Sequence, residues 1–95
     1  MEKIRWTELA LEDLRAIHEY ISKDSIIYAD KFIEKLLLRI EQLETHENSG
    51  RIVPEFENET IRELIEGNYR IIYKLAMSQV FIVRLHHAAQ LLRVV

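Results

Sequence analysis

The chain has 95 residues, of which 48% are apolar and 31% are charged, and it contains no cysteine. This length predicts a single domain over residues 1–95, and the composition excludes both a disulfide framework and thiolate chemistry. The formal net charge of -3 argues against a general nucleic-acid binder, and the lack of an apolar run of membrane-span or signal-peptide length predicts a cytoplasmic protein.

The N-terminal half predicts a strand followed by two helices. The alternating run Lys3–Trp6 is typical of a strand, and Thr7 can cap a helix over Glu8–Ser22, where apolar residues recur every three or four positions. Residues 22–25 interrupt this pattern, and Asp24 or Ser25 can cap a second amphipathic helix that runs to about His46. Two such helices joined by a tight turn predict an antiparallel hairpin whose apolar faces need covering.

The C-terminal half predicts three strands. Residues 50–59, which include Pro54, are expected to form a connecting loop. Strands are expected over residues 60–65, 69–75 and 80–86, joined by short turns. The order β-α-α-β-β-β predicts an α+β fold in which the helical hairpin covers one face of an antiparallel sheet. The other face is expected to stay open, and the tail of the chain is ambiguous between strand and helix.

Charge is distributed unevenly along the chain. Residues 60–95 hold five cations and two acids, a net charge of +3, whereas residues 1–59 carry a net charge of -6. An anionic partner is therefore expected to prefer the C-terminal part.

Strand parity predicts which side chains share the open face. Residues of equal parity lie on one face of a strand, and the more apolar sets are expected against the helices. The residues that this leaves on the open face are Arg70, Ile72, Lys74, Val80, Ile82, Arg84 and His86. Arg62 can join them if the strand register allows it.

The cations of this face can be interpreted in two ways. They can form an ordinary solvated surface, or a patch that binds phosphate or carboxylate, groups that fit the planar arginine fork. His86 and His87 can act as acid or base near neutral pH, but adjacent strand residues face opposite ways, so at most one belongs to such a site. Glu63 can act as a general base or pair with a neighbouring arginine. The histidine spacing predicts no metal site, and Asp13 is interpreted as part of a solvated helix face.

Three strings of the sequence resemble a known family. "GRIVPE" (residues 50–55), "IRELIEGNYRIIYKL" (residues 61–75) and "VFIVRLHHAAQLL" (residues 80–92) occur in an order and spacing similar to the ParE/RelE superfamily of toxins from type II toxin–antitoxin operons. The resemblance implies a bacterial toxin with a helical hairpin on an antiparallel sheet. It also implies a cognate antitoxin that wraps around the toxin in a hetero-oligomer, with no membrane partner.

The resemblance leaves two branches of activity open. RelE-like members cleave mRNA on the ribosome without a metal, using cations to stabilise the scissile phosphate, whereas ParE-like members poison DNA gyrase. A pair of lysines typical of RelE is not matched here, since "TIREL" supplies only Arg62, while Arg70 matches the family's third-strand arginine. The "GR.VPE" loop and the acidic net charge favour the ParE-like branch, although an Arg, His and Glu set serves some RelE relatives.

The resemblance and the parity argument together give a set of expected site residues. The residues expected to carry the toxic activity are Arg62, Glu63, Arg70, Arg84, His86 and His87, with no cofactor. Trp6 and Lys74 are expected to contact the antitoxin. Arg70→Ala is expected to reduce toxicity and leave the fold and antitoxin binding largely intact. A third interpretation is a non-toxic antitoxin-binding module whose activity has decayed, in keeping with Gln90 and the missing lysine pair.

Overall fold

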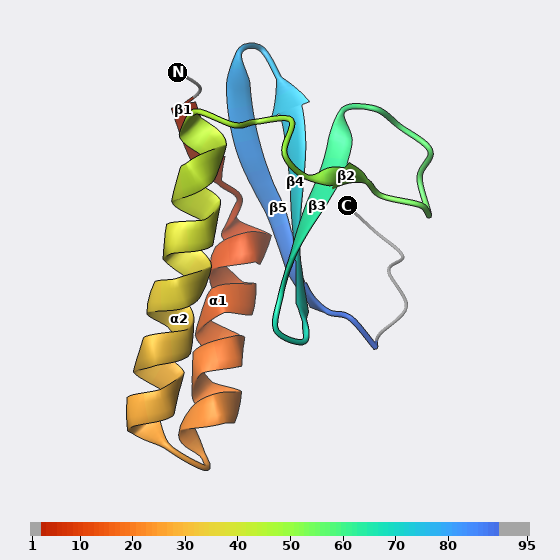
Figure 1. Ribbon diagram of the computed structural model, residues 1–95. Helices are drawn as coiled ribbons and strands as arrows, with labels where there is room; N and C mark the ends of the chain where they lie inside the picture. The colour runs from red at the N-terminus through yellow and green to blue at the C-terminus, as the bar shows by residue number, and fades with distance from the viewer. Residues whose placement is uncertain (1–2, 90–95) are drawn as a thin grey trace.

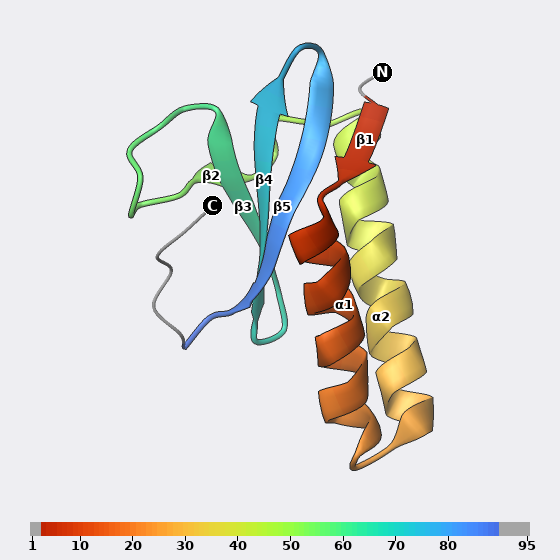
Figure 2. The ribbon, with the colours of Figure 1, turned by 180° about the vertical axis from the view of Figure 1, so that it is seen from behind.

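A computed structural model describes residues 3–89 of the chain and shows two helices packed on one face of a five-stranded sheet. The elements are β1 (Lys3–Trp6), α1 (Glu8–Ser22), α2 (Ile26–Glu41), the short 3₁₀ helix η1 (Gln42–Glu44), β2 (Arg51–Ile52), β3 (Ile61–Glu66), β4 (Tyr69–Ala76) and β5 (Gln79–His87). The strand order is β1-β5-β4-β3-β2, with β1 parallel to β5 and all other neighbours antiparallel. Figures 1 and 2 show α1 and α2 side by side along one side of the sheet. The predicted α+β architecture is confirmed.

Both helices begin at the predicted caps. The hydroxyl of Thr7 accepts a hydrogen bond from the backbone N–H of Ala10 at 3.1 Å, and that of Ser25 accepts one from Tyr28 at the same distance. Each hydroxyl satisfies a first-turn donor that the helix itself cannot pair. The second helix ends at Glu41 rather than near His46, and η1 continues the chain for one tighter turn.

The main core lies between the helices and one face of the sheet. Its buried members are Ala10, Ile17, Phe32, Leu36, Ile40, Leu43, Leu64, Ile71, Tyr73, Val80, Ile82 and Leu85. The helical members recur at the spacing that the sequence predicted, because residues three and four apart share one helix face. Within the described residues, no helix is long and apolar enough to span a membrane.

An irregularity in β5 overturns part of the predicted face assignment. Ile72 pairs with Arg84, but the next residue, Tyr73, pairs with Ile82, so Val83 is an extra residue in β5. An extra residue of this kind forms a β-bulge and reverses the alternation of side chains beyond it. Val80 and Ile82 are therefore fully buried against the helices, and the expectation that they lie on the open face was wrong.

The face away from the helices is not as open as expected. Within residues 50–59, which were expected to be a loop, Arg51 and Ile52 form strand β2 beside β3. The following residues 53–60, here called the strap, connect β2 to β3 on the side of the sheet away from the helices (Figure 1). Val53 of the strap and Ile72 of β4 are fully buried between the strap and the sheet, packed with Phe56, Ile61 and Val83. A second, smaller core therefore covers part of this face.

Candidate functional site

Arg70, the residue on which parity and resemblance agreed, is buried between two carboxylates. Its Nε donates a hydrogen bond to Glu63 of β3, and its Nη1 and Nη2 donate to the two carboxylate oxygens of Glu55 on the strap, at 2.7 and 2.9 Å. Only 7% of Arg70 and 1% of Glu63 are exposed. The guanidinium thus has a fork-to-fork contact with one acid and a single contact with the other, the arrangement that makes Arg–carboxylate pairs strong and directional.

A second arginine completes this cluster. Nε of Arg51 donates to the other oxygen of Glu63, so the buried carboxylate is held from both sides. We call the group formed by Arg51, Glu55, Glu63 and Arg70 the Arg70 clasp. It contains two cations and two anions and is neutral, which is the condition under which charges are tolerated in a protein interior. Glu63 is therefore paired with arginines, as one of its two interpretations expected.

Gly50, which immediately precedes β2, lies in close contact with β3 and β4. Its N–H donates to the hydroxyl of Tyr73 at 2.9 Å, and its carbonyl accepts from Nη1 of Arg62, also at 2.9 Å. A Cβ at this position would lie 2.6 Å from the carbonyl oxygen of Glu63 and from the Tyr73 hydroxyl. Four residues of the "GRIVPE" string contact the sheet through a hydrogen bond, an ion pair or apolar packing. They are Gly50, Arg51, Val53 and Glu55.

Electrostatics reinforces the contact between Glu55 and Arg70. The hydrogen bonds from the Arg70 guanidinium lower the pKa of the Glu55 carboxyl from 4.5 to about 2. The same contact raises the pKa of Arg70 above its ordinary value. Both partners therefore stay charged throughout the physiological pH range.

The Glu55 shift predicts an acid-dependent loss of stability. Because the carboxyl has a lower pKa in the folded state than in the unfolded state, the unfolded chain binds more protons as the pH falls below about 4.5. The stabilisation is expected to be complete above that pH and to disappear as the pH approaches 2. Chemical unfolding of the wild type and of Glu55→Gln across this range measures it. Glu59→Gln, which removes an exposed acid of the strap, is the control, and equal pH profiles for the two variants would contradict the assignment.

Arg62 does not join Arg70. In the register of β3 and β4 it pairs with Tyr73, and its side chain points to the helix-side face, where it bonds the Gly50 carbonyl. Its Nε is buried and has no hydrogen-bond partner among the described residues. Residues of β3 with the opposite parity, Glu63 and Ile65, share the face of Arg70. The register therefore excludes Arg62 from the cluster that the sequence left open to it.

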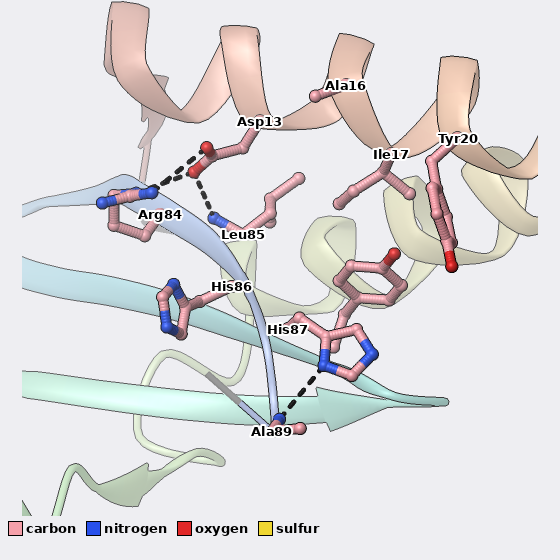
Figure 3. A pocket seen from close by; sticks show the side chains of 10 residues that line it. Asp13, Ala16, Ile17, Tyr20, Arg84, Leu85, His86, His87 and Ala89 are labelled. Carbon is pink, nitrogen blue, oxygen red and sulfur yellow. Dashed lines mark hydrogen bonds and ion pairs between the residues drawn. The ribbon is translucent and has the colours of Figure 1, made fainter. Parts of the chain in front are cut away.

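Arg84 is held by a helix rather than presented on the open face. Asp13 of α1 accepts hydrogen bonds from Nε and Nη2 of Arg84, at 2.8 and 3.3 Å, and from the backbone N–H of Leu85 at 3.0 Å (Figure 3). Strand β1 pairs with β5 only as far as Ile82, so α1 covers the edge of β5 beyond that point. Asp13 was expected on a solvated helix face, and that expectation was wrong because the helix lies directly over this strand edge.

His86 and His87 lie on different sides of β5, as strand alternation predicted (Figure 3). His87 packs edge-on against the ring of Tyr69 on the helix side, with ring centroids 5.2 Å apart. His86 is 8% exposed and is the register partner of Arg70. Both histidines line a pocket of about 520 Å³ between α1 and the end of β5, whose walls include Tyr20 and Tyr69. Of the two, His86 is the one that the fold brings near Arg70.

The remaining sequence-predicted residues lie apart from the clasp. Lys74 is exposed and lies on the same face of β4 as Arg70, two residues beyond Ile72. In the register of the sheet it pairs with Ile61. Trp6 is half-buried and packs on the main core. Gln90 and the rest of the tail lie outside the described residues. No group of three potential metal-ligating side chains occurs within residues 3–89.

Sequence reasoning missed Glu55 and Arg51 as partners of Arg70 and Glu63. The string "GRIVPE" contributed to the family resemblance. Its Glu55 lies 15 residues before Arg70, however, and no sequence pattern indicates a contact at that separation. The strands predicted after it were correct to within one residue, but strand β2 inside it was not predicted. The missing information was the path of the strap back over the sheet.

Comparisons with known proteins agree on one family. The family model described as the ParE toxin of the type II toxin-antitoxin system parDE matches residues 4–92. Toxin RelE2 of Caulobacter vibrioides is 36% identical over 92 residues, which cover 96% of this chain and all of that protein.

Solved structures share the fold. A chain of the chromosomal ParDE system of P. aeruginosa superposes with a TM-score of 0.75 at 22% identity, covering 92% of this chain and 96% of that one. A chain of the RelBE2 toxin–antitoxin complex of Mycobacterium tuberculosis gives 0.58 at 20% identity, covering 90% and 96%. A chain of the DinJ–YafQ complex of E. coli gives 0.56 at 14% identity, covering 94% and 96%. At these identities the likeness concerns the fold.

Proposed function

The chain belongs to the ParE family of toxins of type II toxin–antitoxin systems, and we propose that it arrests bacterial growth by acting on DNA gyrase. The observation that carries this proposal is the closed state of the Arg70 clasp. All three nitrogens of Arg70 are bonded to carboxylates, and Glu63 is bonded to two arginines. A metal-free nuclease needs a cation free to meet the scissile phosphate, and in the resting fold this arginine is already occupied.

The acidic balance of the chain supports the same proposal. A protein whose substrate is ribosome-bound mRNA depends on many contacts to phosphates, and these require a surplus of positive charge. The net charge here is -3. Of the three Lys and Arg side chains expected on the face away from the helices, Lys74 alone is exposed there and unpaired within the described residues. Arg70 is buried, and Arg84 is paired with Asp13 of α1.

We further propose that a cognate antitoxin covers apolar surface of the helical hairpin. RelBE2 and DinJ–YafQ are described as complexes, and ParDE as a toxin–antitoxin system. The exposed large apolar residues of the two helices are Leu9, Leu11, Tyr20, Ile26, Ile27, Tyr28, Leu37 and Leu38. An amphipathic helix lying along the hairpin would bury those that share one side of it. Trp6 and Lys74 remain candidate contacts at its margins.

A ribosome-dependent mRNA endonuclease is the second candidate. The observation that favours it is the placement of Glu63, Arg70 and His86 on one face of three neighbouring strands, the set that some RelE-like members use. In this case the Arg70 clasp would have to open on the ribosome. A binding module without toxicity is the third candidate.

The order in which syntheses fail after induction tests these candidates. The chain is expressed without antitoxin in a bacterial host, and incorporation of label into DNA and protein is followed over the first minutes. DNA synthesis is expected to fail first, and the purified protein is expected to trap cleaved DNA with gyrase. Gly50→Ala, which is expected to destabilise the fold through close contacts with the Glu63 carbonyl and Tyr73, serves as the loss-of-fold control at an equal protein level.

The other outcomes decide against the gyrase proposal. An early collapse of protein synthesis with mRNA cut at codon-related positions would replace it with the nuclease. Normal growth in the presence of soluble, folded protein would replace it with the antitoxin-binding module.

A further inference from the structure

The outer half of the Arg70 guanidinium is occupied by an acid of the chain itself. Nη1 and Nη2 each donate to one oxygen of Glu55, in the fork geometry that arginine also uses for phosphate. We propose that Arg70 is a latent phosphate-binding site, and that Glu55 masks it by acting as an internal substitute for the phosphate.

The two acids on Arg70 differ in how easily they can leave. The Glu63 side chain is fully buried, is part of strand β3 and is held by Arg51 as well. The Glu55 side chain is 32% exposed and is carried by the strap, outside any strand. Glu63 therefore orients Arg70 permanently through Nε, whereas Glu55 can turn toward solvent by a change of side-chain rotamer.

The strap can release Glu55 without unfolding. Its attachment to the sheet is made by neighbouring residues. Val53 is buried against Ile72, its N–H donates to the carbonyl of Ile61 at 3.1 Å, and Phe56 packs on the same small core. These contacts do not involve the Glu55 carboxylate. Ile65, opposite Arg70 in the register, is 44% exposed, so the face beside the guanidinium is reachable from solvent.

The charges favour phosphate as the class of ligand. The Arg70 clasp is neutral with Glu55 in place and carries one net positive charge when Glu55 swings away. A carboxylate from a partner would only reproduce what Glu55 already supplies within the chain. A phosphate group offers three acceptor oxygens and up to two negative charges, and so gains more from the exposed fork.

This inference is independent of the cellular target, because it concerns the isolated protein and a small anion. In the masked state Arg70 cannot serve a phosphate, which agrees with the closed clasp on which the proposed function rests. Movement of Glu55 away from Arg70 would allow phosphate to bind, but would not by itself cleave RNA.

Removing the mask tests the proposal. Binding of inorganic phosphate to purified wild type, Glu55→Ala, Glu55→Gln and Glu59→Ala is measured by NMR, with the Nε–H signal of Arg70 as the reporter of position. Glu59→Ala is the matched control, since it removes one exposed acid of the same strap and gives the same net charge as Glu55→Ala. Both Glu55 variants are expected to bind phosphate about tenfold more tightly than the control, because a hydrogen-bonded charge is worth that much or more.

The competing outcomes are distinct. Equal affinity in the Glu55 variants and in Glu59→Ala would mean that only net charge matters, and would overturn the proposal. Tighter binding that leaves the Arg70 signal unmoved would place the anion elsewhere and overturn it too. The isosteric Glu55→Gln retains the shape of the side chain and decides the question even if Glu55→Ala fails to fold.

Discussion

Replacing Arg70 with alanine is expected to lower the free energy of unfolding by about 3 kcal/mol or more, because it leaves Glu63 buried with only one of its two cations. The variant also frees Glu55 from the sheet. The sequence alone predicted that Arg70→Ala leaves the fold largely intact, whereas the structure predicts a loss of stability. A loss of toxicity in this variant would report instability before it reported a missing catalytic group. Urea unfolding followed by circular dichroism measures the effect.

The control for this experiment is Lys74→Ala. Lys74 lies on the same strand and the same face, but it is exposed, so its removal is expected to change stability by less than about 0.5 kcal/mol. A conservative variant adds a second test. Arg70→Lys keeps the charge but loses the fork, so its stability is expected to lie between those of the wild type and Arg70→Ala. Equal unfolding midpoints for Arg70→Ala and Lys74→Ala would show that the clasp contributes little.

Gly50→Ala is expected to be as damaging, although it adds only one methyl group. The added Cβ would lie 2.6 Å from the Glu63 carbonyl oxygen, and this atom belongs to the backbone of a central part of the sheet and cannot move aside cheaply. It would also press on the Tyr73 ring and hydroxyl, which bonds the Gly50 N–H. Forced overpacking and the loss of that bond together predict a cost of about 3 kcal/mol or more.

The neighbouring residue provides the comparison. Ser49 is exposed, and Ser49→Ala is expected to leave the unfolding midpoint nearly unchanged. Thermal unfolding of the two variants beside the wild type is sufficient. A wild-type midpoint for Gly50→Ala would mean that the segment can shift away from β3 and β4, and the close approach would then have no structural importance.

The helices could be predicted from the sequence because their signals are local. The caps Thr7 and Ser25 and the apolar spacing of each helix lie within a few residues of one another, and each local preference agrees with the final fold. Strands β3, β4 and β5 were predicted to within one residue for the same reason, whereas β2 lies where a loop was expected. The pairing of β1 with β5 was not predicted, since nothing local to Lys3–Trp6 specifies a partner some 75 residues away.

The site could be predicted only in part. Arg70 and His86 were correctly placed on one face, because parity is preserved along β4 and from Arg84 to His86. Glu63 was not placed there, because the register of β3 was unknown and the face was left open to Arg62 instead. The bulge at Val83 is a single extra residue without a distinctive sequence, so parity arguments failed for Val80 and Ile82 on its other side. The roles of Glu55 and Asp13 depend on where a loop and a helix come to lie, which residue spacing does not encode.

The reach of α1 over the end of β5 also bears on how the protein behaves at high concentration. A strand edge with unpaired N–H and C=O groups is a template on which further chains can add, and edge-to-edge growth of this kind leads to aggregation. Here the two edge strands are short: β1 has four residues, and β2 has two, one of them a charged arginine. Where β5 extends beyond the end of β1, Asp13 accepts a hydrogen bond from the N–H of Leu85. Short edge strands and one helix side chain thus protect both margins of the sheet against self-association.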